Sequence, residues 1–355
     1  MSGTVRLCFH REARAAETHV NLSALRVEGR CLWLAGDETA TIERLVAGAD
    51  GTVYDDHTTY RLADLVDLPG DADAEADIEG IARSESYLWA VGSHSLKRKK
   101  IKDKHGTGKA FDRLATVAAE DNRNVLVRIP VVRDDDGLPT LVREAEQDGR
   151  PMQAAVLGGS GDKTLRDLLA DDEHLGPFVA IPSKDNGLDI EGIGINGSRV
   201  YVGMRGPVLR GWAVLLELEP YADADDAGRL RLRTLDDDLP YIKHLLDLGG
   251  LGIRDLCPHG DDLLLLAGPT MDLDGPVRVY RWHGAGKVQE GTVVRDEDVT
   301  VEVDLPYGEG VDHAEGIVVL DPDDDGADRL LVVYDSPAPE RLDGGCVTAD
   351  VVRLG

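Results

Sequence analysis

The sequence predicts an all-β fold, a β-propeller, because one short phrase recurs along the chain and opens the same two-strand unit each time. Asp-Ile-Glu-Gly-Ile occurs at residues 77–81 and 189–193, and His-Ala-Glu-Gly-Ile at 313–317. Weaker copies are Asn-Leu-Ser-Ala-Leu at 21–25 and Gly-Ile-Arg-Asp-Leu at 252–256. Each copy leads into an apolar run, a polar turn and a second apolar run. Repeats of this length are the signature of a propeller of four-stranded blades.

The spacing of the copies sets the number of blades. They start at residues 21, 77, 189, 252 and 313, so three of the four intervals are 56 to 63 residues long. A four-stranded blade needs roughly 40–60 residues, so each of these intervals fits one blade. The remaining interval of 112 residues fits either one blade with two insertions or two blades, one with a decayed phrase. We favour five blades over six, in a single domain spanning residues 1–355.

Two segments account for the long interval. The first, residues 96–123, holds six of the ten lysines and a helix expected at 110–119. It follows a second strand, so it is either a lid that supplies positive charge to an anionic substrate or a solvated loop paired with nearby acids. The second, residues 151–188, is expected to be a helical connection in which Thr164 caps a helix.

The two ends of the chain are expected to close the ring. Only 42 residues follow His313, enough for about three strands of the last blade. The N-terminal segment 4–9 supplies the missing outer strand beside the C-terminal strand at 346–354. Closure of this kind removes the exposed sheet edges that promote aggregation.

Composition excludes several classes of function. The chain has 39 basic and 67 acidic residues, a formal charge of −28 that opposes binding to nucleic acid or to an anionic membrane. It has no apolar run of 18 residues, and its first residues lack the pattern of a signal peptide, so we expect a cytoplasmic protein. The four cysteines form no CxxC pair, which favours free thiols over a zinc site or a disulfide framework.

Propeller geometry brings the phrase residues to one opening. The innermost strands all run the same way and the second strands return antiparallel, so the start of one and the end of the other share a face of the disc. The third phrase positions hold Ser23, Glu79, Glu191, Arg254 and Glu315, and the first positions include Asp77, Asp189 and His313. The second strands end near Asp37, Glu38, His94, Arg205, residues 270–272 and Asp335.

So many carboxylates around one mouth require a cation, a counter-charge or raised pKa values. We assign Glu79, Glu191 and Glu315 as candidate catalytic residues. The candidate ligands of a divalent cation (Ca²⁺, Mg²⁺ or Mn²⁺) are these three together with Asp77, Asp189 and Asp255. The candidate contacts for an anionic substrate are Arg205, Arg254, His94, His313 and Lys97. The alternative is structural: each glutamate accepts backbone N–H groups from the neighbouring blade and locks it in place.

The chain resembles a bacterial family known as domain-of-unknown-function family 3616. The resemblance rests on the phrases at 77–81, 189–193, 252–256 and 313–317 and on Met-Arg-Gly-Pro at 204–207. The repeated Glu-Gly phrase is also similar to that of esterase-like phytase propellers. That second resemblance implies a propeller with divalent cations in an acidic channel and phosphoester chemistry, although the chain lacks the secretion signal usual for those enzymes.

The sequence therefore predicts a cytoplasmic propeller that binds a small anionic ligand, together with a divalent cation, at an acidic channel mouth. If it is an enzyme, a metal-assisted phosphoester hydrolase is the expected class. The competing class is a non-catalytic propeller scaffold for protein–protein interaction, with structural glutamates. The sequence leaves the oligomeric state, the metal and the substrate open.

Overall fold

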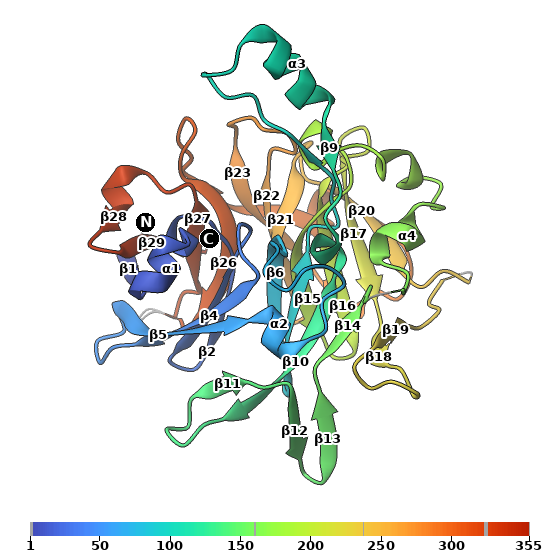
Figure 1. Ribbon diagram of the computed structural model, residues 1–355. Coiled ribbons are helices and arrows are strands. Elements are labelled where there is room, and N and C mark those ends of the chain that lie inside the picture. The colour runs from blue at the N-terminus through green and yellow to red at the C-terminus, as the bar shows by residue number, and fades with distance from the viewer. Residues whose placement is uncertain (1–2, 160, 237, 323–325, 355) are drawn as a thin grey trace.

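The computed structural model describes residues 3–159, 161–236, 238–322 and 326–354. Five inner strands stand side by side around a central axis, each in contact with the next and the last in contact with the first (Figure 1). They are β2 (Leu22–Glu28), β6 (Ile78–Arg83), β15 (Asp189–Asn196), β21 (Gly252–His259) and β26 (His313–Leu320). Each of the five recurring phrases opens or overlaps one of these strands, as the propeller prediction requires.

Antiparallel strands extend each inner strand outward into a blade. After β2 come β3 (Cys31–Gly36), β4 (Thr41–Ala47) and β5 (Val53–Arg61). After β6 come β7 (Tyr87–Gly92) and β10 (Leu126–Arg133), the latter flanked by β11 (Pro139–Leu141) and β14 (Ala155–Leu157). After β15 come β16 (Arg199–Gly206), β17 (Trp212–Leu218) and β20 (Ile242–Asp247), and β24 (Val293–Val294) then pairs in parallel with β20. After β21 come β22 (Asp262–Gly268), β23 (Val277–Trp282) and β25 (Val299–Leu305).

The last blade is completed by the N-terminus. After β26 come β27 (Arg329–Asp335) and β29 (Cys346–Arg353), with β28 (Leu342–Asp343) and then β1 (Gly3–Cys8) paired to β29. Strand β1 also pairs in parallel with β5, so one strand joins the last blade to the first. This confirms the expected closure by both ends of the chain.

A disulfide bond links the two ends of the chain at this closure, so the expectation that the cysteines are free thiols is wrong for two of the four. Register places Cys8 directly opposite Cys346 on β29, and the two sulfur atoms are bonded. The link joins residues 338 positions apart in the sequence. The other two cysteines, Cys31 and Cys257, are free and buried as expected.

The core lies between adjacent blades. Strands β3 and β22 are buried along almost their whole length because blades cover both of their faces. Apolar side chains of neighbouring sheets interdigitate there; Leu25, Ile317 and Leu331, for example, belong to one cluster. None of the helices within the described residues has the length and apolar character needed to span a bilayer.

The segment between β7 and β10 forms an arm, residues 97–118, that extends away from the blades (Figure 1). It consists of the short strands β8 (Lys97–Arg98) and β9 (Val117–Ala118), which pair with each other, and helix α3 (Thr107–Ala115). The helix begins and ends earlier than the expected 110–119, since the chain turns at Thr116 to form β9. The remaining small helices are α1 (Arg11–Ala15), α2 (Leu62–Leu65) and α4 (Leu165–Leu169), and the remaining short strands are β12 (Glu144–Gln147), β13 (Arg150–Gln153), β18 (Pro220–Ala222) and β19 (Leu230–Leu232).

The connection at 151–188 is only partly helical. It starts within β13 and includes β14, which pairs with β10, before α4 begins. Thr164 caps α4 as predicted: its hydroxyl accepts from the Asp167 N–H while the Asp167 carboxylate accepts from the Thr164 N–H. This reciprocal pattern satisfies two donors that a helix start leaves unpaired.

Every inner strand contains a β-bulge at the same place in the phrase. Register shifts fall between Leu22 and Ala24, Ile78 and Gly80, Ile190 and Ile193, Ile253 and Asp255, and Ala314 and Gly316. The third phrase position thus lies within the shift in each blade, as Ser23, Glu79, Glu191, Arg254 or Glu315, and in β15 the shift also includes Gly192. A bulge releases a residue from the ladder and changes the direction of its side chain.

The glycine that follows the bulge lets neighbouring inner strands approach closely. A Cβ on Gly80 would lie 2.9 Å from the backbone nitrogen of Ile193, and one on Gly192 would lie 2.7 Å from the Cα of Asp255. Gly192 also has φ +88°, a conformation that side chains disfavour. The recurring Glu-Gly pair therefore combines a redirected side chain with a narrow contact between blades.

Below this ring, Arg26 crosses the central channel. Its guanidinium forms two contacts of 3.0 and 3.1 Å with the carboxylate of Asp255. It also donates to backbone carbonyls of four inner strands, those of Leu25, Ile193, Leu256 and Ile317. Both side chains are buried, so the pair ties the inner strands together across the axis.

Candidate functional site

The site lies at the face where inner strands begin and second strands end. Glu79, Glu191, Arg254 and Glu315 come from the bulges of four adjacent inner strands, and Arg205 comes from the end of β16. Seven carboxylates and three guanidinium groups influence one another there: Asp37, Asp77, Glu79, Asp189, Glu191, Glu315 and Asp335 with Arg123, Arg205 and Arg254. Carboxylates therefore outnumber guanidinium groups at the mouth.

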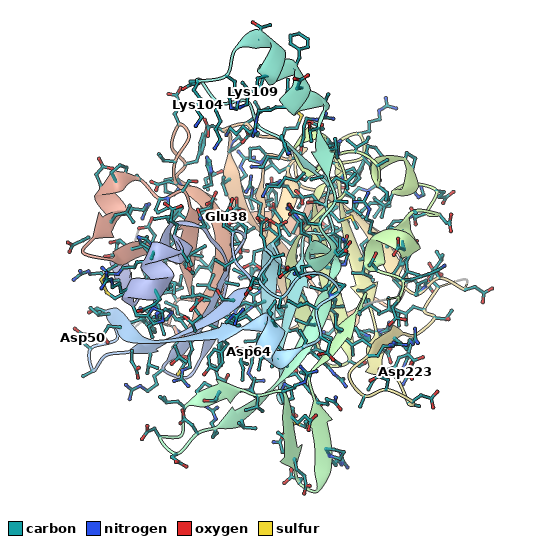
Figure 2. All side chains as sticks on the ribbon, viewed as in Figure 1. Glu38, Asp50, Asp64, Lys104, Lys109 and Asp223 are labelled. Atoms are coloured by element: carbon teal, nitrogen blue, oxygen red, sulfur yellow. A yellow bond between two sulfur atoms is a disulfide. The ribbon has the colours of Figure 1, made fainter. Side chains whose placement is uncertain are left out.

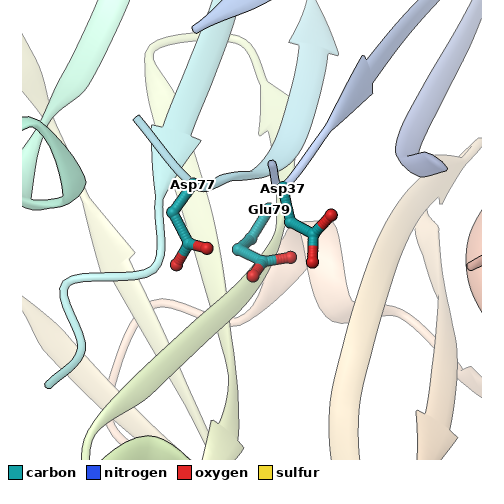
Figure 3. A group of neighbouring side chains, drawn as sticks. All are labelled: Asp37, Asp77 and Glu79. Carbon is teal, nitrogen blue, oxygen red and sulfur yellow. The ribbon is translucent and has the colours of Figure 1, made fainter. Parts of the chain in front are cut away.

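One part of the mouth consists of carboxylates alone. Carboxylate oxygens of Asp37, Asp77 and Glu79 lie within 4.8 Å of one another. Figure 3 shows the three side chains next to each other, arriving from the loop after β3, from the residue before β6 and from the β6 bulge. We call these three residues the acidic triad.

Two members of the triad have no partner. The side chains of Asp37 and Glu79 form no ion pair or hydrogen bond with any residue in the described ranges, and Oδ1 of Asp37 is fully buried. Asp77 differs because its carboxylate contacts the guanidinium of Arg123. Carboxylates withdrawn from water without partners are costly, and Arg123 is the one guanidinium in direct contact with the triad among the described residues, so its three carboxylates are only partly compensated.

The remaining carboxylates are matched by arginines. Arg205 lies 2.5 Å from Asp189 and 2.7 Å from Glu191, each distance joining a guanidinium nitrogen to a carboxylate oxygen. Arg254 contacts Glu315 directly and lies 4.0 Å from Glu191. Oε2 of Glu191 is buried and has no hydrogen-bond partner among the described residues. The mouth thus divides into an unpaired acidic part and a part balanced by arginine.

The pKa values reflect this division. Burial, followed by repulsion from Asp335 and Asp77, raises the pKa of Asp37 well above its ordinary value. Burial and repulsion from Asp77 raise the pKa of Glu79 well above its ordinary value too. These shifts have the sign expected where several negative charges share a small volume.

The structure places the predicted anion contacts in different surroundings. His313 lies at the mouth, 3.2 Å from Asp274, and the Asp335 and Asp274 carboxylates raise its pKa. Lys97 contacts both oxygens of Glu75 at 3.2 Å, and the Glu75 charge raises the lysine pKa although burial opposes it. His94 does not join the carboxylates.

The ring of His94 is fully buried on the side of the mouth that faces α4. Its Nδ1 binds the carbonyl of Gly92 at 2.8 Å, and its nearest charges are Arg166 and Asp167. Burial lowers the pKa of His94 to about 4, so the ring is neutral at physiological pH. It is poorly placed to hold an anion at the mouth.

Asp255 lies apart from the predicted metal ligands. Its carboxylate is fully occupied by Arg26 and by backbone N–H groups of Leu256 and Ile317. In the phrase it stands where three of the other blades have glycine and the first has Ala24, so its side chain enters the channel below the mouth. A carboxylate that accepts a backbone N–H group from the neighbouring blade was the structural alternative for the glutamates. Within the described residues this contact is made by Asp255, which accepts from the Ile317 N–H, and not by the glutamates of the phrase.

Two residues of the site, Asp37 and Arg123, are not among the predicted ligands or catalytic residues. Asp37 follows β3 and is expected at the mouth, but it lies outside the recurring phrase that marks the predicted ligands. Arg123 comes from the irregular segment before β10 and pairs with Asp77. The equivalence of second-strand ends is the signal for Asp37, whereas no sequence pattern marks Arg123.

A cavity of about 630 Å³ lies elsewhere, on the outer edge of the first blade beneath α1. Its lining includes the buried carboxylate of Glu43, which accepts hydrogen bonds from Thr41, Thr59 and His57. That carboxylate is satisfied by its own surroundings. The mouth, in contrast, has unpaired groups, and it is the stronger candidate for ligand binding.

The ring of inner strands, the outward antiparallel blades and the closure by β1 define the class of protein: it is a β-propeller with a polar channel mouth. The chain belongs to the family DUF3616, described as a protein of unknown function, whose model matches residues 21–350. No curated protein shows significant similarity to the chain.

Solved structures with the same general architecture are only distantly similar. Glutaminyl cyclase from Myxococcus xanthus has 11% identity and a TM-score of 0.41, with 99% of this chain and 98% of that chain covered. The PQQ-bound aldose sugar dehydrogenase from Streptomyces coelicolor has 13% identity and a TM-score of 0.35, with 99% of each chain covered. The Cps50 (Swd1) β-propeller domain from Myceliophteria thermophila has 9% identity and a TM-score of 0.33, with 93% and 95% covered.

Proposed function

We propose that the protein binds a divalent cation at the channel mouth through the acidic triad of Asp37, Asp77 and Glu79. The observation that carries this proposal is that the carboxylates of Asp37 and Glu79, half-buried and close to Asp77, form no ion pair or hydrogen bond within the described residues. A cation bound between the three carboxylates would replace mutual repulsion with attraction.

The chemistry of the donors indicates the type of cation. All three ligands are carboxylate oxygens, which suit the hard cations Ca²⁺, Mg²⁺ and Mn²⁺. These cations take six or more ligands, so three protein side chains leave positions for water or for an oxygen of an anionic ligand. A small anionic ligand would then bind mainly through the cation, because Arg205 and Arg254 are already engaged by carboxylates.

The reaction class that best suits this arrangement is metal-assisted hydrolysis of a phosphoester. When bound, the cation supplies Lewis acidity and lowers the pKa of a water molecule. Around it, Arg205 orients Glu191, while Arg254 orients Glu315 and shares its charge. The buried, unpartnered Oε2 of Glu191 is the acceptor best placed to take a proton in this mouth.

Titration calorimetry with Ca²⁺, Mg²⁺ and Mn²⁺ after chelation tests the cation site. We expect one equivalent to bind, and we expect Asp37→Asn or Glu79→Gln to weaken binding by at least about 100-fold, more than loss of an outer-sphere partner does. Glu38→Gln is the matched control, since Glu38 is adjacent but exposed and lies outside the triad. Absence of binding, or equal loss in the control, would refute the proposal.

Hydrolysis is tested separately with a panel of phosphoesters and the bound cation. Activity that depends on the cation and disappears in Glu191→Gln, with cation binding retained, supports the enzyme. A protein that binds the cation but hydrolyses nothing fits the alternative of a non-catalytic scaffold whose mouth charges are structural.

A further inference from the structure

The arm at residues 97–118 carries a charge opposite to that of the rest of the chain. It contains eight lysines and arginines against two aspartates, in a protein with a formal charge of −28. Its base is held by Lys97 to Glu75 and by Arg98 to Asp185. Figure 2 shows Lys104 and Lys109 at its far end, beyond the blades.

The arm also exposes an apolar surface. Phe111 is 74% exposed and Leu114 is 45% exposed, and the two lie three residues apart on one side of α3. Ile101 and Val117, next to the helix, are more than 40% exposed. No residue of α3 is buried, so within the described structure the apolar face of this helix has no partner.

A second exposed apolar surface lies on the mouth face, and it is acidic. In the loop after β22, Met271 and Leu273 alternate with Asp272 and Asp274. The loop before β26 adds Tyr307 and Glu309, and the two loops are joined by a hydrogen bond from the Gly310 N–H to Asp274. We call residues 271–274 and 307–309 the acidic rim. Leu273 is 63% exposed and Tyr307 is 49% exposed.

These two surfaces hold most of the large exposed apolar side chains that the structure describes. Seven of the twelve belong to them: Ile101, Phe111, Leu114, Val117, Met271, Leu273 and Tyr307. One surface combines apolar anchors with lysine and the other combines them with aspartate and glutamate. Apolar clusters of this kind on a soluble domain mark interaction sites.

The two surfaces are adjacent in one molecule. Lys100 of the arm lies 3.5 Å from Asp272 of the rim, while the far end of the arm points away. Two copies related by a two-fold axis can therefore exchange arms, each α3 packing on the rim of the other copy. Such a contact is self-complementary and closed.

We propose that the occupant of the exposed arm is a second copy of this chain, bound through reciprocal contacts between the basic arm and the acidic rim. Charge complementarity favours this occupant over an anionic membrane or nucleic acid. Those partners match the arm but not the acidic surface that surrounds its base. A second copy matches both surfaces at once.

The test is the mass of the full-length protein in solution, measured by light scattering after size exclusion and by sedimentation. We expect a dimer of twice 38.3 kDa at micromolar concentration. The double variant Phe111→Ser with Leu114→Ser should weaken dimerisation by at least about tenfold. Tyr221→Ser is the control, because Tyr221 is also an exposed aromatic residue, at 38%, but lies on β18.

A charge exchange makes the test specific for the proposed pairing. Lys102→Glu with Lys104→Glu in one chain, and Asp272→Lys with Glu309→Lys in another, should each reduce self-association. Mixing the two should restore a dimer that contains one copy of each.

Three results would overturn the proposal. One is a monomer throughout the accessible concentration range, and another is a dimer that survives both sets of variants. The third is a monomer that binds vesicles of anionic lipid through Phe111, which would assign the arm to membranes instead.

Discussion

Replacing the half-buried Asp37 by asparagine should stabilise the cation-free protein, whereas most substitutions in a folded protein destabilise it. At 4.8 Å, two ionised carboxylates repel each other by about 3.5 kcal/mol if the effective dielectric constant is about 20. Asp37 faces two such neighbours, Asp77 and Glu79. Proton uptake relieves part of this repulsion, so we expect a net gain of about 1–3 kcal/mol near neutral pH.

Thermal unfolding with and without divalent cation measures this effect. For a chain of this length, each kcal/mol corresponds to roughly 1–2 °C in Tm, so chelated Asp37→Asn should melt about 1–6 °C higher than the parent. The parent should gain about 2.7 kcal/mol when the cation is present at 100 times its Kd, and a variant that binds 100-fold more weakly should gain at most about 0.4 kcal/mol.

Asp189→Asn is the matched control for this experiment. Asp189 is also a buried mouth carboxylate, but it is paired with Arg205, so its replacement leaves a buried guanidinium short of charge and should destabilise the protein in both conditions. The reasoning is refuted if Asp37→Asn and Asp189→Asn shift Tm in the same direction without cation.

Three further outcomes are expected. Arg26→Met should cost about 3–5 kcal/mol in urea unfolding by leaving Asp255 buried and unpaired, whereas adding Asp255→Leu should recover most of that loss; equal costs for the single and double variants would contradict the pairing. Because the folded-state pKa values of Asp37 and Glu79 are raised, their contribution to stability is present below about pH 4 and is lost as pH rises through the folded values. Tm of the chelated protein should therefore fall as pH rises through that window, and added cation should reduce the fall. Cys8→Ser should lower the free energy of unfolding by up to about 6 kcal/mol, the chain-entropy value for a loop of 338 residues; a change under about 1 kcal/mol would mean that the disulfide adds little to the closure.

The repeated phrase predicted the architecture because its Glu-Gly pair has a steric cause. Glycine is needed wherever one inner strand approaches the next, as at Gly80 and Gly192, so the phrase marks each inner strand in the sequence. The closure was predictable for a similar reason, since the last copy of the phrase leaves too few residues for a complete blade. The disulfide follows from the register of that closure, and the sequence alone does not give the register.

The individual roles of the mouth residues were harder to predict from the sequence. Asp255 occupies a phrase position, yet its carboxylate binds Arg26 of another inner strand. No local sequence pattern links two residues that are 229 positions apart. His94 follows a second strand like Asp37, but a positive φ of 53° turns the chain there and its ring ends up beside α4. Local periodicity places a residue on a face, whereas partner choice depends on contacts between blades.

The bulges have a consequence for how such a protein changes over time. A residue outside the hydrogen-bonded ladder can be exchanged without breaking the backbone hydrogen bonds that hold the strands of a blade together. Serine, glutamate and arginine already occupy equivalent bulge positions in this one chain, at Ser23, Glu79 and Arg254. The framework thus offers five equivalent positions whose side chains set the charge of the channel mouth without changing the strand order, provided that paired charges such as Glu191 and Arg205 change together.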